Sequence, residues 1–186
     1  MKLRYSSVTD SITSTSRSIE YMGDKFVLVS ITIDVPTPEK SYFFKGGFQW
    51  RLYDKAEPLI VSLDIRDDID VSNGILTEIR FFISEPFIQK SVRMLLNQEK
   101  IQGVPILGLG CKETNDGYYH EQMGNYTFYL IDNFLYCLFG DIEVATVIQI
   151  NEEFGCLLDC QKELSGFFIS NLSDQDIKIF HKANLV

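Results

Sequence analysis

Apolar and polar residues alternate through much of the first half of the chain. Between residues 25 and 35 every second position is apolar, namely Val27, Val29, Ile31, Ile33 and Val35. The same period returns over residues 42–52, 59–65 and 75–83, and Asn73-Gly74 is a hairpin signal before the last of these runs. Because side chains on a strand alternate between its two faces, this period predicts strands with one apolar and one polar face. The short turns between them predict a four-strand antiparallel meander over residues 25–83.

The segment after the meander has a helical pattern. Ser84 can cap a helix, Pro86 suits its first turn, and Phe87, Val92 and Leu95 share one face. The pattern ends before Gly103, so we expect a central helix over residues 85–101. Its apolar stripe would cover the dry face of the sheet.

A second series of strands is predicted over residues 104–170. The candidate strands are residues 104–109, 126–131, 134–139, 142–150 and 154–158, with an Asp132-Asn133 turn between the second and third. Ser173 and Asp176 then have the spacing of a capping box, which predicts a short C-terminal helix over residues 174–182.

The N-terminal 24 residues are less regular, with nine Ser or Thr between residues 6 and 18. This composition indicates a loose arm or an edge strand. No repeat and no long linker divides the chain, so residues 1–186 are predicted to form a single domain. The expected fold class is α+β, mainly antiparallel sheet of about 8–10 strands with two helices.

Composition bears on the cellular setting. At 45% hydrophobic residues the chain can bury a core without disulfides or a metal. The longest apolar run, Phe134 to Phe139, has six residues, whereas a membrane span needs about 20, and the N-terminus lacks the apolar stretch of a signal peptide. We therefore expect a soluble cytoplasmic protein.

The four cysteines are predicted to be free thiols. Cys137 and Cys156 lie in apolar runs and are interpreted as core residues. Cys156 and Cys160 have no second pair of ligands nearby, and the two histidines are far apart in sequence, so no metal site and no cofactor are expected.

Residues 110–125 form the one long stretch without a periodic pattern, which predicts a functional loop. It contains Cys111 and His120, a thiol and an imidazole that could serve nucleophilic catalysis if the fold brings them together. It also contains Tyr118 and Tyr119, whose large rings commonly anchor protein interfaces.

The charge is unevenly distributed. Residues 94–186 carry 5 Lys or Arg against 13 Asp or Glu, which is −8 of the total net charge of −9. Such a surface either keeps the protein soluble or captures a basic protein partner, and it disfavours nucleic acid and anionic membranes. The second interpretation assigns partner binding to Glu113, Asp116, Tyr118, Tyr119, Glu121, Asp141, Glu143, Glu152 and Glu153.

In size, charge and the segments GYYHEQMGNYTFYLIDNFLYCLFGD and 113–159, the chain resembles bacterial immunity proteins, which neutralise cognate toxins. The resemblance implies a non-catalytic cytoplasmic inhibitor that holds a basic toxin domain, often a nuclease, in a tight complex. Two alternatives stay open. One is a small enzyme that uses Cys111 and His120, and the other is a ligand-binding or assembly module.

Overall fold

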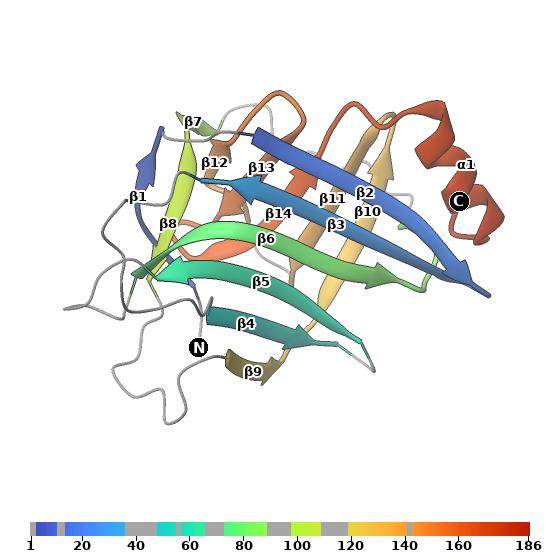
Figure 1. The fold of residues 1–186 in the computed structure, drawn as a ribbon, viewed down its shortest axis with the longest axis horizontal. Coiled ribbons are helices and arrows are strands. Elements are labelled where there is room, and N and C mark those ends of the chain that lie inside the picture. The colour runs from blue at the N-terminus through green and yellow to red at the C-terminus, as the bar shows by residue number, and fades with distance from the viewer. Residues whose placement is uncertain are drawn as a thin grey trace.

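A computed structural model describes residues 3–10, 14–35, 48–54, 57–65, 73–88, 98–108, 119–140 and 143–186. These residues form two β-sheets and one short helix (Figure 1). The larger sheet contains β1 (Arg4–Thr9), β2 (Ser14–Gly23), β3 (Phe26–Asp34), β4 (Phe48–Tyr53), β5 (Pro58–Ile65), β6 (Asn73–Ile83), β8 (Val104–Gly108) and β9 (Tyr119–Met123). The smaller sheet contains β7 (Glu99–Gln102), β10 (Tyr126–Ile131), β11 (Phe134–Phe139), β12 (Thr146–Gln149), β13 (Phe154–Leu158) and β14 (Leu164–Ile169). The helix is α1 (Asp174–Lys182).

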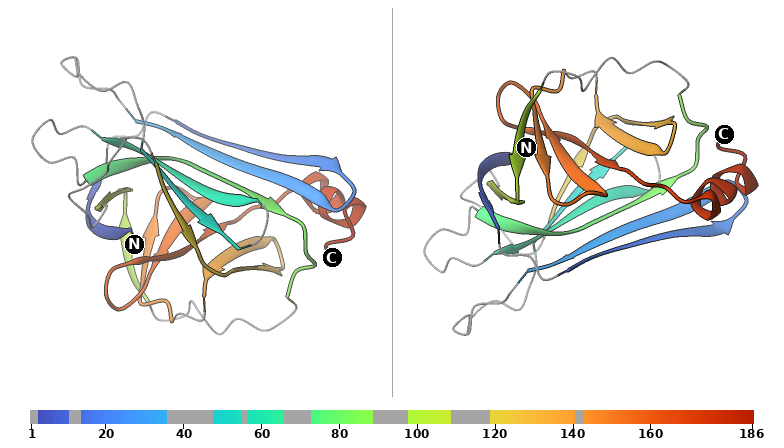
Figure 2. Two further views of the ribbon diagram at one scale, coloured as in Figure 1. Left: turned by 90° about the horizontal axis from the view of Figure 1, so that it is seen from below. Right: turned by 90° about the horizontal axis from the view of Figure 1, so that it is seen from above.

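The two sheets pack face to face as two layers, with α1 at one end (Figure 2). Strands of the smaller sheet run across the direction of those in the larger sheet (Figure 1). Among the described residues, no helix is both long enough and apolar enough to span a bilayer.

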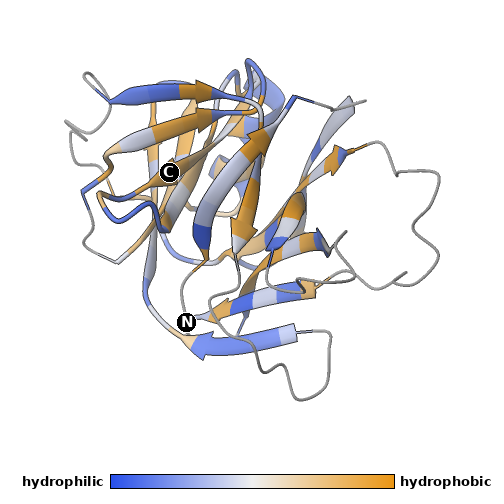
Figure 3. Ribbon diagram, turned by 90° about the vertical axis from the view of Figure 1, so that its left-hand side faces the viewer, coloured by the Kyte–Doolittle hydropathy of each residue, from blue (hydrophilic) through white to orange (hydrophobic). Residues whose placement is uncertain are grey.

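The predicted alternation is confirmed on β3 and β4. On β6 it holds only from Ile79 to Ile83, since Ile75 and Leu76 are both buried where the pairing with β5 shifts register. On β3 the buried side chains Val27, Val29, Ile31 and Ile33 alternate with more exposed ones. Figure 3 shows the same alternation of hydrophobic and hydrophilic residues along several strands. The Asp132-Asn133 turn between β10 and β11 is also confirmed, while residues 36–47 of the first predicted turn and strand lie outside the described part.

The order of the first strands differs from a simple meander. β4, β5 and β6 are antiparallel neighbours, but β3 pairs with β6 rather than with β4. β6 is long enough to pair with two strands along the same edge. Its residues 78–83 pair with β3, and its residues 73–75 pair with β8. Asn73 and Gly74 belong to this start, so their assignment to a hairpin turn was wrong.

The central helix predicted over residues 85–101 was also wrong in the residues that the structure describes. Residues 85–88 are not helical, and Glu99–Gln102 is the strand β7, which pairs in parallel with β12; residues 89–97 lie outside the described part. Among the described residues, it is mainly the smaller sheet that covers the dry face of the larger one. The strand count, fourteen in the described residues, is accordingly higher than predicted.

The C-terminal helix is confirmed, with both bonds of the predicted capping box. The Ser173 hydroxyl accepts from the Asp176 backbone N–H, and the Asp176 carboxylate accepts from the Ser173 backbone N–H. Arg17 on β2 holds this end in place, since its guanidinium lies 3.2 Å from an Asp176 oxygen and donates to the Ser170 carbonyl oxygen.

The N-terminal segment contains an edge strand in residues 14–23, which pairs with β3. An edge strand was one of the two predicted alternatives for this segment.

At two corners the chain passes directly from one sheet to the other. Gly103 separates β7 from β8, and Gly124 with Asn125 separates β9 from β10. Gly103 has a φ of 123°, which favours glycine, and a Cβ there would lie 3.0 Å from the Thr9 carbonyl oxygen. The strands β7 and β9 at these corners form the two parallel pairs among the described strands.

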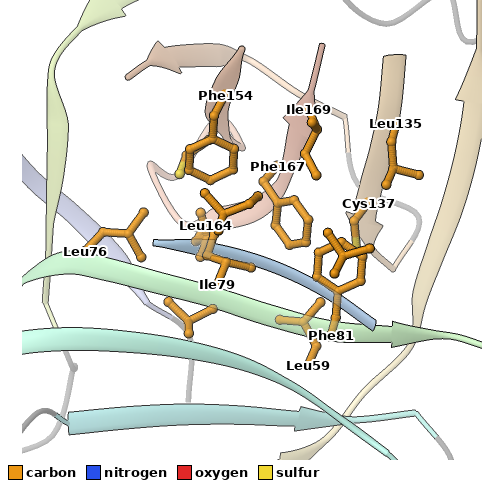
Figure 4. Close-up of a cluster of buried hydrophobic side chains, with 14 of the residues drawn as sticks. Leu59, Leu76, Ile79, Phe81, Leu135, Cys137, Phe154, Leu164, Phe167 and Ile169 are labelled. Carbon is orange, nitrogen blue, oxygen red and sulfur yellow. The ribbon is translucent and has the colours of Figure 1, made fainter. Parts of the chain in front are cut away.

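One continuous core fills the space between the sheets. The rings of Phe81 on β6 and Phe167 on β14 lie 5.1 Å apart, and Trp50 on β4 lies 5.7 Å from Phe139 on β11. Figure 4 shows side chains of both sheets meeting in this core. Cys137 is fully buried among them, as predicted.

The close approach of β14 and β11 generates a stability prediction. A Cβ at Gly166 would lie 2.2 Å from the Cys137 carbonyl oxygen, a backbone atom that cannot move alone. Gly166→Ala should therefore lower the free energy of unfolding by about 2–3 kcal/mol, measured by urea denaturation. Ser16→Ala, at an exposed position of β2, is the control and should change it by less than about 0.5 kcal/mol. Equal values for the two variants would contradict the prediction.

Candidate binding site

The strand β9 lies at the end of the larger sheet and carries large exposed side chains. β4 is its only partner among the described strands. Tyr119 is 56% exposed and Met123 is 74% exposed, and Glu121 lies between them on the same side. Residues 119–123 were predicted as part of a loop over 110–125, and that prediction was wrong because their backbone pairs with β4.

A network from β4 holds the exposed side of β9 in place. The Arg51 guanidinium lies 3.1 Å from a Glu121 carboxylate oxygen and 4.5 Å from the centre of the Tyr119 ring. The Tyr53 hydroxyl donates to the same Glu121 oxygen, and the Gln49 side chain accepts from Arg51. Arg51 therefore orients both Tyr119 and Glu121, and it also offsets the charge of Glu121.

Beyond the end of β9, a groove of about 550 Å³ opens at the β9–β10 corner. The groove and β9 adjoin because Gly124 donates its backbone N–H to the Tyr53 carbonyl oxygen, which places the corner beside Asp54. The lining residues come from β3, the β4–β5 connection, the end of β6 and the start of β10: Phe26, Asp54, Glu57, Phe82, Ser84, Glu85, Pro86, Ile88, Asn125, Tyr126, Thr127 and Phe128.

The wall made by residues 84–88 is fixed at both of its sides. Ile88 donates its backbone N–H to the Phe128 carbonyl oxygen on β10, and Phe87 donates to the Leu185 carbonyl oxygen near the C-terminus. The buried Phe87 ring also packs edge-on against Phe180 of α1, with 5.1 Å between ring centres. The groove is therefore built into the packing of the two sheets and the helix.

Carboxylates and aromatic rings dominate the groove. Its described lining contains three acidic residues and no lysine, arginine or histidine. Neither Asp54 nor Glu57 forms an ion pair with a described residue; Lys55 and Ala56, between them in sequence, lie outside the described part. Burial raises the pKa of Tyr126 to about 12, and the negative charges of Asp54 and Glu57 act in the same direction. The Tyr126 phenol is therefore neutral at physiological pH and donates to the Glu57 carbonyl oxygen.

Of the residues predicted to bind a partner, those that the structure describes lie at separate places. Tyr119 and Glu121 lie on β9, whereas Glu152 and Glu153 lie in the β12–β13 turn beside β2, at the opposite edge of the larger sheet. Glu143 is exposed before β12. Like Glu121, Glu153 is close to an arginine, 3.9 Å from Arg17. Glu113, Asp116, Tyr118 and Asp141 lie outside the described residues.

Sequence reasoning missed the groove and Met123. Asp54, Glu57 and Glu85 are in the half of the chain that is nearly neutral overall, so the charge map pointed away from them. The one available signal was the turn composition of residues 54–58. Nothing in the sequence indicated that this turn would meet the start of β10.

The catalytic alternative requires Cys111 and His120 side by side, and only His120 is among the described residues. His120 aligns with the buried Trp50 on β4 and so faces the interior side of β9, while Cys111 lies outside the described part. The described residues contain no group of three His, Cys, Asp or Glu side chains placed to hold a metal ion. Chemically, the described arrangement is suited to recognition by charge and aromatic contact.

No family model and no curated protein matches the chain.

The cysteines generate a second prediction. Burial raises the pKa of the Cys137 and Cys156 thiols, whereas Cys160 is exposed. A thiol reagent at pH 8 should label Cys160 quickly in the native protein, and Cys137 and Cys156 only after denaturation, because access and thiolate fraction control the rate. Peptide mapping by mass spectrometry locates the label. Native labelling of Cys137 or Cys156 as fast as that of Cys160 would refute the burial of these two thiols.

Proposed function

We propose that the protein is a non-catalytic binding protein that captures a basic protein partner on the exposed side of β9 and the adjoining groove. The supporting observation is that exposed apolar side chains lie near two carboxylates, those of Asp54 and Glu57, that form no ion pair with a described residue. Tyr119, Met123, Phe26 and Ile88 are all at least 37% exposed. Phe26 and Ile88 line the groove together with Asp54 and Glu57, and Met123 pairs with Tyr53, the residue before Asp54. Exposed apolar groups gathered at one place are typical of interaction surfaces.

In its most specific form, the proposal is that the chain is an immunity protein. It would neutralise a basic bacterial toxin, such as a nuclease, in the cytoplasm. Its support is the sequence resemblance together with the charge of this surface. Clustered negative charge accelerates capture of a positively charged protein, and large apolar side chains slow its release. Glu152 and Glu153, at the opposite edge, are not part of the proposed surface.

The proposal predicts separate effects on the two rates of binding. Tagged protein purified from its native host should retain one basic protein in equal amount, and co-expression should relieve that protein's toxicity. Tyr119→Ala combined with Met123→Ala should raise the dissociation rate about 30-fold or more, because truncating an aromatic or large apolar anchor costs about 2 kcal/mol. The association rate should fall as salt is raised from about 0.05 to 0.5 M. Both rates are measured by biolayer interferometry.

Glu20→Gln, an exposed position on β2 at the opposite edge of the larger sheet, is the control and should change neither rate. If no partner is retained, or if the double variant releases the partner no faster than Glu20→Gln does, the proposed function is wrong.

A further inference from the structure

We infer that the groove at the β9–β10 corner binds an arginine side chain from an extended segment of the partner. This inference rests on the proposed function and deepens it, because it names the chemical group that the partner inserts. The argument depends on the groove's size, its charge and its aromatic lining.

The volume of the groove favours a ligand larger than a single ion or water molecule. A volume of about 550 Å³ lies within the range of about 300–1,000 Å³ that is typical of ligand sites. The groove can therefore admit a long side chain together with some of its flanking backbone. It lies next to the end of β9, where a segment resting on Tyr119 and Met123 would reach it.

The acidic lining of the groove favours a cationic ligand. Asp54, Glu57 and Glu85 line the groove, and the described lining offers no basic residue. The Tyr126 hydroxyl lies 3.0 Å from the Glu57 carbonyl oxygen, so this phenol and the acidic residues line the same part of the groove. Asp54 and Glu57 form no ion pair with a described residue, so a guanidinium would offset their charge, whereas an anionic or neutral ligand would not.

Aromatic side chains favour arginine over lysine. Phe26, Phe82, Tyr126 and Phe128 line the same space as the carboxylates. A planar guanidinium stacks on aromatic faces and is more weakly hydrated than an ammonium, so it loses less on entering a partly apolar groove. The Tyr126 phenol adds no negative charge of its own, since burial raises its pKa to about 12, and its hydroxyl donates to the Glu57 backbone carbonyl oxygen.

The test uses the full chain, labelled with ¹⁵N, and three short peptides. Each is capped at both ends and has the sequence Gly-X-Gly, where X is arginine, citrulline or lysine. Citrulline has nearly the shape of arginine but no charge. We expect the arginine peptide to bind with a dissociation constant on the order of 1 mM, at least tenfold tighter than citrulline and a fewfold tighter than lysine. The shifted amide signals should be those of Asn125, Tyr126, Thr127 and Phe128.

Two variants separate charge from folding. The double variant Asp54→Asn with Glu57→Gln keeps the side-chain shapes and should raise the dissociation constant of the arginine peptide at least tenfold. The control Glu20→Gln should change this constant by less than twofold. Unchanged amide spectra away from the groove would show that the double variant folds. Equal affinity for the arginine and citrulline peptides, or signal shifts confined to other residues, would overturn the inference. So would binding of free arginine as tight as that of the peptide, since the ligand would then not be a chain segment.

The captured partner distinguishes failure of this inference from failure of the proposed function. The partner could bind the Asp54/Glu57 double variant as tightly as the wild type, yet dissociate faster from the Tyr119/Met123 double variant than from the wild type. In that case the inference of an arginine site is wrong and the proposed function stands. If the arginine peptide behaves as expected but the full chain retains no basic protein, the proposed function is wrong and the groove's preference for arginine stands.

Discussion

The burial of one dry face on each sheet against the other is the constraint on which the rest of the structure depends. Phe81 on β6 and Phe167 on β14 meet near the middle of this contact, and both are fully buried. Each phenylalanine contributes about 1.5–3 kcal/mol when it is removed from water, so neither sheet can expose that face alone. The shared core explains why β6, at the centre of the larger sheet, has pairing partners along nearly its whole length.

The corners follow from the same constraint. Once two sheets with crossing strands share a core, the chain can pass directly from one sheet to the other at a corner, and Gly103 and Gly124 mark two such corners. At Gly124 a side chain would collide with Leu52, since a Cβ would lie 2.5 Å from its Cδ1 atom. Glycine therefore allows β9 to end close against β4. The groove opens at this corner, beside the connection that follows β4.

Charge at the surface divides into two kinds, and the difference bears on function. Glu121 lies close to Arg51 on β4 and Glu153 lies close to Arg17 on β2, so these two carboxylates mainly fix local geometry. Asp54 and Glu57 form no ion pair with described residues and lie beside exposed aromatic and aliphatic groups. A carboxylate already compensated by its own protein gains less from a cationic ligand than one that is not. The proposed capture of a basic partner therefore depends on the groove carboxylates more than on the total acidity of the second half of the chain.

The sequence by itself determined the elements whose signal is local. Alternation along β3 and β5 predicted strands because each strand buries one face, and the Ser173–Asp176 spacing predicted the start of α1 because a capping box involves only neighbouring residues. Tertiary structure decided the elements whose partners are distant. β7 and β9 are strands because β12 and β4 offer them hydrogen-bonding edges, and this overrode the helical pattern of residues 99–101 and the irregular pattern of residues 119–123. It also decided the groove, because Asp54, Glu85 and Tyr126 are separated by many residues and meet only where the two sheets join.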